Sequence, residues 1–182
     1  SAAVMTFLAL AGSAAATRVA MGDERVDHSM PAEQQQPRPC LNEGVYAEFD
    51  FWVGSWEVLG ADGQQLGTNR VDKTLDGCLL IENWTSATGG TGKSINYYDP
   101  SRSQWMQSWV DSGGTIILVS GGLVDGSMQL EGKHILQDGT EVPYRMSFSP
   151  LPDGRVRQFI EQSRDGGKTW YVWFEGFYVR RD

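Results

Sequence analysis

Residues 115–149 read TIILVSGGLVDGSMQLEGKHILQDGTEVPYRMSFS, three apolar segments separated by Asp125-Gly126 and Asp138-Gly139. Asp-Gly steps tolerate the positive φ angles that tight hairpin turns require, so each step predicts a reversal of the chain. The segments on either side have the length of strands. This stretch therefore predicts three consecutive antiparallel strands.

The same signal recurs on both sides of this stretch. Seven further turn signals are Asp62-Gly63, Asp76-Gly77, Gly89-Gly90, Asp99-Pro100, Gly113-Gly114, Asp153-Gly154 and Asp165-Gly166. Nine reversals separate ten segments, which is an antiparallel meander. The predicted strands are Trp56–Gly60, Gln65–Leu75, Cys78–Ser86, Lys93–Asp99, Gln104–Asp111, Thr115–Gly121, Ser127–Leu136, Glu141–Ser149, Arg155–Ser163 and Thr169–Arg180. Only the stretch before Trp56 has room for a short helix.

Ten long strands in up-and-down order are expected to close on themselves, because an open sheet would leave two unpaired edges. The sequence therefore predicts an all-β fold, a single up-and-down antiparallel barrel of about ten strands. A barrel of that size is wide enough to hold a small-molecule ligand. A β-sandwich is the alternative that the turn pattern leaves open.

The N-terminal region differs in composition from the rest of the chain. Residues 2–16 are apolar and rich in small side chains, and they end in Ala14-Ala15-Ala16, which is typical of part of a secretory signal peptide. An ordinary apolar helix is the alternative. The polar residues 17–39 predict a disordered linker, and residues 40–182 predict the barrel domain. We expect an exported protein, periplasmic or extracellular, with no membrane span in its mature form.

The chain has two cysteines, Cys40 and Cys78. In an exported protein an isolated pair predicts a disulfide, which would tie the start of the domain to the third strand. Two buried free thiols are the alternative. Neither cysteine has the spacing of a zinc ligand, and no phosphate- or dinucleotide-binding glycine pattern is present. The sequence thus predicts no metal and no cofactor.

The formal net charge is −8. Nucleic-acid binding requires a basic surface, and no run or stripe of basic residues occurs in the chain, so a nucleic-acid partner is excluded. An acidic surface is most simply a means of keeping the protein soluble. The sequence does not indicate an oligomeric state.

Alternation with a period of two assigns side chains to the two faces of each strand. Four strands have a mixed face, on which aromatic side chains alternate with single polar or charged groups. These faces are Cys78, Leu80, Glu82 and Trp84; Trp105, Gln107 and Trp109; Arg157, Phe159 and Glu161; and Trp170, Val172, Phe174 and Tyr178. We favour the mixed faces as the inside of the barrel. The alternative is that they meet solvent, and that apolar faces such as Tyr144, Met146 and Phe148 form the core.

A lumen with apolar walls and a few oriented polar groups is typical of a ligand site. The candidate ligand-binding residues are Glu82, Trp84, Asn96, Trp105, Gln107, Trp109, Arg157 and Glu161. We therefore expect a binding module for a partly apolar small molecule with a polar head. The alternative is a lyase, isomerase or hydrolase that uses Glu82 or Glu161 for proton transfer and Arg157 to stabilise an anion. A third hypothesis is a structural domain with a filled interior, because fold alone does not decide function.

Residues 163–170, SRDGGKTW, fit the Asp-box pattern S-x-D-x-G-x-T-W. The pattern predicts a hairpin in which the Ser and Asp side chains bind turn amides and the Trp packs beneath. We interpret this single box as structural.

Several separate motifs carry a resemblance to a known family. They are FDFWVGSW (49–56), Gly77-Cys78, Glu82-Asn83-Trp84, GKSINYYD (92–99), WMQSWVD (105–111) and VRQ (156–158). Together they resemble a bacterial family of lipocalin-like, calycin-type domains with no assigned function, over about residues 40–181. Gly54-Ser55-Trp56 is similar to the G-x-W motif of lipocalins. The resemblance implies that Trp56 closes the base of the barrel, with Arg180 or Arg181 packed over its ring.

Overall fold

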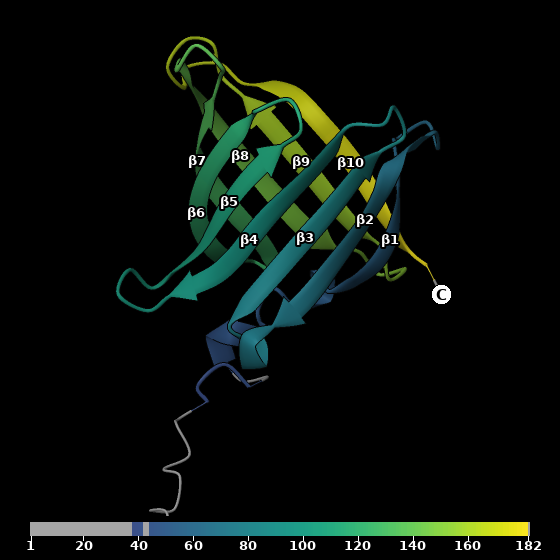
Figure 1. The fold of residues 1–182 in the computed structure, drawn as a ribbon, viewed down its shortest axis with the longest axis vertical. Helices are drawn as coiled ribbons and strands as arrows, with labels where there is room; N and C mark the ends of the chain where they lie inside the picture. The colour runs from purple at the N-terminus through teal and green to yellow at the C-terminus, as the bar shows by residue number, and fades with distance from the viewer. Residues whose placement is uncertain (1–37, 42–43, 182) are drawn as a thin grey trace, which may run out of the picture. The chain divides into compact units, whose positions relative to one another are not determined.

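Ten antiparallel strands close into a barrel in a computed structural model that describes residues 38–41 and 44–181 (Figure 1). Each strand pairs with its neighbours along the chain, and the first pairs with the last. The strands are β1 (Gly54–Leu59), β2 (Gln65–Thr74), β3 (Leu79–Ser86), β4 (Thr91–Asp99), β5 (Gln104–Asp111), β6 (Ile116–Val124), β7 (Ser127–Ile135), β8 (Glu141–Pro150), β9 (Val156–Gln162) and β10 (Tyr171–Arg180). The predicted up-and-down barrel is confirmed, and the sandwich alternative is wrong.

All nine turn signals lie at the reversals between consecutive strands. Gly126 and Gly139 have φ angles of 79° and 83°. This is the left-handed conformation that glycine adopts without strain, and it is the reason why Asp-Gly steps favour tight turns. The largest error in a strand end is at β6, which continues to Val124 instead of stopping at Gly121. It continues because Val124 still pairs with Ser127, so that only Asp125-Gly126 remains for the turn.

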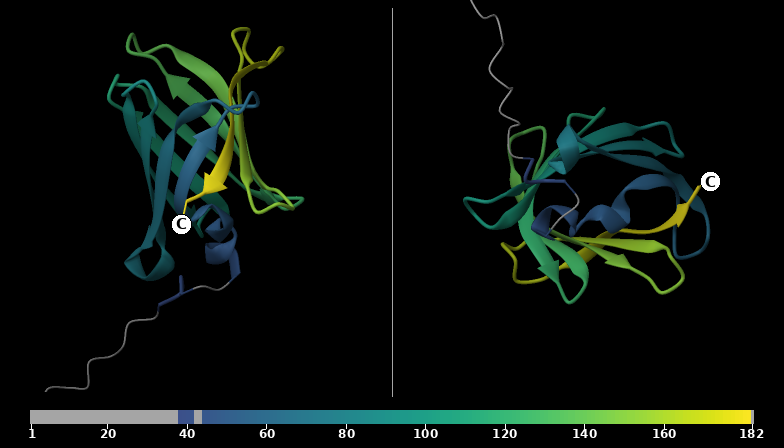
Figure 2. Two further views of the ribbon diagram at one scale, coloured as in Figure 1. Left: turned by 90° about the vertical axis from the view of Figure 1, so that its right-hand side faces the viewer. Right: turned by 90° about the horizontal axis from the view of Figure 1, so that it is seen from below.

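The segment before β1 closes one end of the barrel. It contains two short 3₁₀ helices, η1 (Gly44–Ala47) and η2 (Asp50–Trp52), as the sequence predicts for this stretch. The view from below in Figure 2 shows these helices, in dark blue, lying across the opening. Phe49 and Trp52 are fully buried, and their rings stack with centroids 4.9 Å apart. We call residues 44–53 the plug.

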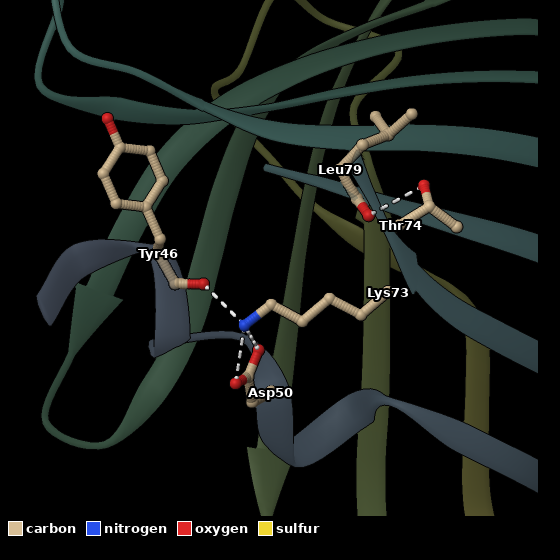
Figure 3. A network of polar contacts seen from close by, with 5 residues as sticks. All are labelled: Tyr46, Asp50, Lys73, Thr74 and Leu79. Carbon is tan, nitrogen blue, oxygen red and sulfur yellow. Dashed lines mark hydrogen bonds and ion pairs between the residues drawn. The ribbon is translucent and has the colours of Figure 1, made fainter. Parts of the chain in front are cut away.

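An ion pair holds the plug to β2 (Figure 3). Lys73 Nζ donates to both carboxylate oxygens of Asp50, at 2.7 and 2.8 Å, and to the backbone carbonyl of Tyr46 at 3.2 Å. The Lys73 side chain is only 13% exposed, so its charge is partly removed from water and requires this partner. The contact fixes the plug against the barrel wall.

A disulfide joins Cys40 to Cys78, with their Cα atoms 4.9 Å apart. Cys78 lies between a third 3₁₀ helix, η3 (Leu75–Gly77), and β3. The expectation that only the stretch before Trp56 has room for a short helix is therefore wrong, because the turn before β3 also forms one. The bond therefore ties the chain just before the plug to the turn that precedes β3. The predicted disulfide is confirmed, and the free-thiol alternative is wrong.

Trp56 lies at the base of the barrel and is fully buried. Its indole nitrogen donates to the carbonyl of Trp52 in the plug, at 2.9 Å. The guanidinium carbon of Arg180 lies 4.4 Å from the Trp56 ring centroid, which is a cation–π contact. This is the geometry that the G-x-W resemblance implies, with Arg180 as the basic residue.

The Asp-box hairpin joins β9 to β10. Asp165 accepts hydrogen bonds from the backbone nitrogens of Thr169 and Lys168, and Ser163 accepts one from Gly167. Hydrogen bonds from Thr169 and Ser163 lower the pKa of Asp165 to about 2. The side chains thus hold the turn, as the pattern predicts.

The predicted signal peptide, residues 1–16, and residues 17–37 of the predicted linker lie outside the described residues. In the part of the chain that the structure describes, no helix has the length and apolar character needed to cross a membrane.

Candidate functional site

The mixed faces of β3 and β5 point into the barrel, as we predict. Leu80, Glu82, Trp105 and Gln107 are all at most 4% exposed, and Trp84 and Trp109 pack against the core. The apolar faces of β6 and β8 also point inward. The two alternatives that we weighed are therefore both realised, on different strands.

The prediction for β9 is wrong, because its mixed face points outward. Arg157 pairs with Glu175 at 2.6 Å, and Glu161 pairs with Arg145 at 2.7 Å. Both ion pairs join β9 to a neighbouring strand on the outer surface. The inward side of β9 is formed by Val156, Gln158, Ile160 and Gln162. Arg157 and Glu161 therefore do not belong to an interior site.

The prediction for β10 is half right, because a bulge interrupts its alternation. The register with β9 shifts between Val172 and Phe174. Val172 on one side of the bulge is 55% exposed, whereas Tyr178 on the other side is buried. The ring of Trp170 lies outside the barrel, 4.2 Å from the guanidinium carbon of Arg145.

A cavity of about 400 Å³ occupies the barrel on the side away from the plug. Its wall is mostly apolar and aromatic: Trp84, Trp109, Ile117, Tyr144, Met146, Ile160, Trp173, Phe174 and Tyr178. The cavity reaches Gly90 and Ser112 in the hairpins at the end of the barrel opposite the plug. From Ser86, where β3 ends, Glu82 lies about 13 Å deeper along the strand, at ~3.3 Å per residue.

Three glycines, two on the strand next to the ring and one on the same strand as the ring, let three of these aromatic rings lie along the wall. A Cβ atom at Gly92 would lie 2.1 Å from the Trp109 ring, and one at Gly67 would lie 2.6 Å from Trp84. A Cβ at Gly176 would lie 2.8 Å from Phe174. Because these positions have no side chain, the aromatic rings lie directly over the glycine backbone and leave the lumen open. We call Gly67, Gly92 and Gly176 the glycine seats.

A continuous chain of polar side chains crosses the barrel below the aromatic wall. We call it the polar belt, and its members are Asn69, Glu82, Ser94, Asn96, Gln107, Gln158 and Tyr178. All are less than 9% exposed.

One half of the belt leads to Glu82 from β5. Gln107 donates to Asn96 at 2.6 Å, Asn96 donates to Ser94 at 2.9 Å, and Ser94 donates to Glu82 Oε2 at 2.6 Å. The other half leads to Glu82 from β9. Tyr178 donates to Gln158 at 2.7 Å, while Asn69 Nδ2 donates both to Tyr178 and to Glu82 Oε1. Both halves therefore end at the two oxygens of one carboxylate.

Glu82 has no ion-pair partner among the described residues, and it is only 4% exposed. Burial raises its pKa to about 7, although the hydrogen bonds from Ser94 and Asn69 act in the opposite direction. Burial and the nearby Glu82 charge raise the pKa values of Tyr144 and Tyr178 well above their ordinary range. Near neutral pH, Glu82 therefore changes charge while both tyrosines stay neutral.

Two belt amides have a polar atom left for a bound molecule. Gln107 uses its nitrogen within the belt and Gln158 uses its oxygen, and both residues line the cavity. An acceptor on Gln107 and a donor on Gln158 therefore remain in the lining of the cavity that Glu82 also lines. The inner end of the cavity combines a titratable carboxyl with groups of both hydrogen-bonding polarities.

Of the eight predicted ligand-binding residues, four line the cavity: Glu82, Trp84, Gln107 and Trp109. Asn96 lies behind the lining, within the belt. Trp105 lies at the floor, where its ring contacts Phe49 of the plug edge-on, with centroids 5.6 Å apart. We did not predict Asn69, Ser94 and Gln158, which lie on the inward, buried faces of β2, β4 and β9.

His134, on β7, is 8% exposed and points inward. Its Nδ1 is 2.9 Å from Gln162 Nε2, whose amide oxygen accepts a hydrogen bond from Tyr171. Burial lowers the pKa of His134. The histidine is thus neutral near pH 7, and its partner is another protein side chain. Compared with models of protein families and with curated proteins, the chain has no match among either.

Proposed function

We propose that this chain is an exported, lipocalin-like carrier that binds one small molecule inside the barrel, with its apolar body between the aromatic rings and its polar head at the belt. The observation that carries the proposal is the cavity of about 400 Å³, whose aromatic wall ends at a buried carboxyl group. Pockets of this size, apolar with a few convergent polar groups, are typical of small-molecule sites.

Export is supported by the disulfide between Cys40 and Cys78, because structural disulfides persist mainly in oxidising compartments. The apolar, small-residue character of residues 2–16 supports the same conclusion. The Trp56–Arg180 contact supports membership of the lipocalin-like family.

Native mass spectrometry of gently purified protein, compared with the same sample after denaturation, tests the binding function. We expect a discrete excess mass that is lost on denaturation. Calorimetric titration of ligand-free protein with 1-naphthylmethanol, an apolar ring with a polar head, is expected to show one molecule bound per chain. A bare mass, also after incubation with cell extract, together with no heat of binding, would favour a barrel with only a structural role.

Gly92→Ala is expected to weaken binding of 1-naphthylmethanol about tenfold, the scale of a forced repacking. The new methyl group would lie 2.1 Å from the Trp109 ring, so the ring must move into the cavity. Gly122→Ala is the matched control, because no atom lies within 4 Å of its added Cβ. Calorimetry measures both affinities; equal affinities in the two variants would contradict the assignment of Trp109 to the binding wall.

The enzyme hypothesis retains one of its three candidates. Arg157 and Glu161 lie outside the barrel, but Glu82 has a pKa of about 7 within the cavity. A carboxyl group with such a pKa is suited to proton transfer near neutral pH. If a molecule released from the protein returns chemically changed after incubation with wild type, but unchanged after incubation with Glu82→Gln, the carrier is a catalyst.

A further inference from the structure

We propose that the molecule held in the cavity carries a positively charged amine, which binds at Glu82 while its apolar body lies between the aromatic rings. This inference rests on the proposed function, since it assigns the charge of the ligand of that same cavity.

The ionisable side chains that line the cavity provide the first argument. Glu82 at the inner end and Asp111 near the hairpins are acidic, and no lining side chain is basic. Among the described residues, the arginines nearest in sequence to the lining of β8 and β9 form ion pairs on the outer surface: Arg145 with Glu161, and Arg157 with Glu175. Lys73 is bound to the plug. A cation therefore meets attraction along the whole cavity, whereas an anion meets repulsion.

The hydrogen bonds of Glu82 provide the second argument. Both carboxylate oxygens accept a bond, from Asn69 and from Ser94, each at 2.6 Å. This arrangement suits the ionised carboxylate, which only accepts hydrogen bonds. A buried carboxylate without a counter-charge is costly, even when it is hydrogen-bonded. An ammonium group supplies the missing charge and up to three donors.

The aromatic wall above Glu82 provides the third argument. Trp84 is two residues from Glu82 on the same inward face, and its ring meets Phe174 edge-on with centroids 6.3 Å apart. Trp109 lies beside them on β5. The faces of such rings attract cations, and the attraction strengthens in a desolvated site. A carboxylate below and aromatic rings around it form a site for a protonated amine.

Other titratable groups lie on the inner side of the barrel, on strands that do not pair with β3. Tyr144 on β8 and Tyr178 on β10 remain neutral because their pKa values are raised, and burial lowers the pKa of His134 on β7. Asp111 on β5 adds a second carboxyl group near the hairpins. Because burial raises the pKa of Glu82 to about 7, we assign the change in cavity charge around pH 7 to this group.

Three probes with one naphthalene ring test the proposal: 1-naphthylmethylamine, 1-naphthylmethanol and 1-naphthoate. Calorimetry at pH 8 measures their affinities for wild type and for Glu82→Gln. The amine remains protonated, because alkylammonium groups have pKa values of about 10. We expect the amine to bind wild type about tenfold or more tightly than the alcohol, as charge-assisted bonds are about twice as strong as neutral ones. The naphthoate should bind most weakly.

Glu82→Gln should remove this preference for the amine over the alcohol, because glutamine keeps the shape of the side chain but not its charge. Gln158→Glu is the converse variant, since it adds a third carboxyl group at the cavity, beside those of Glu82 and Asp111, and should strengthen the preference for the amine. Equal binding of the amine and the alcohol to wild type would overturn the proposal, and so would a preference that persists in Glu82→Gln.

Proton release provides a measurement on wild type that does not depend on any variant folding. Binding of the amine at pH 7 should release about half a proton, since Glu82 is then about half protonated and must ionise. Titrations in buffers of different ionisation enthalpy measure this number, and the alcohol should release none. An amine that binds without proton release contradicts the assignment of Glu82. If only the alcohol binds, the proposal of a positively charged ligand is contradicted but the proposed carrier function is retained. If none of the three probes binds, both proposals are contradicted.

Discussion

Replacing both Cys40 and Cys78 by serine is expected to lower the free energy of unfolding by about 4 kcal/mol, from the entropy of closing a loop of this length. The disulfide spans a sequence separation of 38 residues, which include the whole plug, β1 and β2. Without it the unfolded chain gains conformations, and the folded chain loses the bond that fixes the segment before the plug. Denaturant unfolding followed by tryptophan fluorescence measures the change.

Reduction of the wild type supplies the control for this prediction. A reductant should bring the stability of the wild type down to that of the double serine variant, and it should have no effect on the variant itself. A loss below about 1 kcal/mol would show that the Lys73–Asp50 contact and the buried aromatics hold the plug without the disulfide.

Glu82→Gln is expected to become more stable relative to wild type by about 3 kcal/mol between pH 4.5 and pH 8, as the linkage of a pKa shift to stability requires. The pKa of Glu82 is about 7 in the folded protein, against 4.5 ordinarily. The folded state therefore binds the proton more tightly than the unfolded state. The stabilisation from the protonated group is complete below about pH 4.5, and it is lost as the pH rises through about 7. Glutamine has no such titration.

Denaturant unfolding at half-unit steps of pH measures the free energy of unfolding of wild type and of Glu82→Gln. Taking the difference between the two free energies at each pH removes the contribution of all other titratable groups. Glu161→Gln is the matched control, because Glu161 lies on the outer surface beside Arg145. Its effect should stay below about 1 kcal/mol across the same range, as for most exposed ion pairs. Parallel stability curves for wild type and Glu82→Gln would show that Glu82 ionises at its ordinary pKa.

The order of the strands could be predicted because it depends on local signals. Each turn is encoded by two adjacent residues, such as Asp125-Gly126, and its conformation requires no information from distant parts of the chain. The closure of β1 on β10 then follows from the need to pair both edges. The disulfide was also predictable, since the chain has only two cysteines.

The direction of individual faces could not be predicted with the same success. On β9 both faces alternate polar with apolar residues, so the period of two does not distinguish inside from outside. What decides it is the pairing of Arg157 with Glu175 and of Glu161 with Arg145, which join residues of different strands. On β10 a bulge shifts the alternation, and nothing in the local sequence marked its place.

The site was predicted in part for the same reason. The inward position of Glu82 follows from the alternation of β3 alone, but its partners Asn69 and Ser94 come from β2 and β4. Trp105 was assigned to the ligand because it shares a face with Trp109. The plug takes it out of the cavity, and this contact depends on how Phe49 folds back under the barrel.

The glycine seats also bear on how such a protein can change over generations. At Gly92 and Gly176 an added methyl group would meet mainly side chains, whereas at Gly67 it would lie 2.3 Å from the backbone oxygen of Thr85. A glycine codon becomes an alanine codon by one nucleotide change. For the carrier that we propose, single mutations at Gly92 or Gly176 would therefore change the shape of the cavity and with it the set of molecules that fit. Two backbone positions would then be enough for the proposed binding selectivity to evolve.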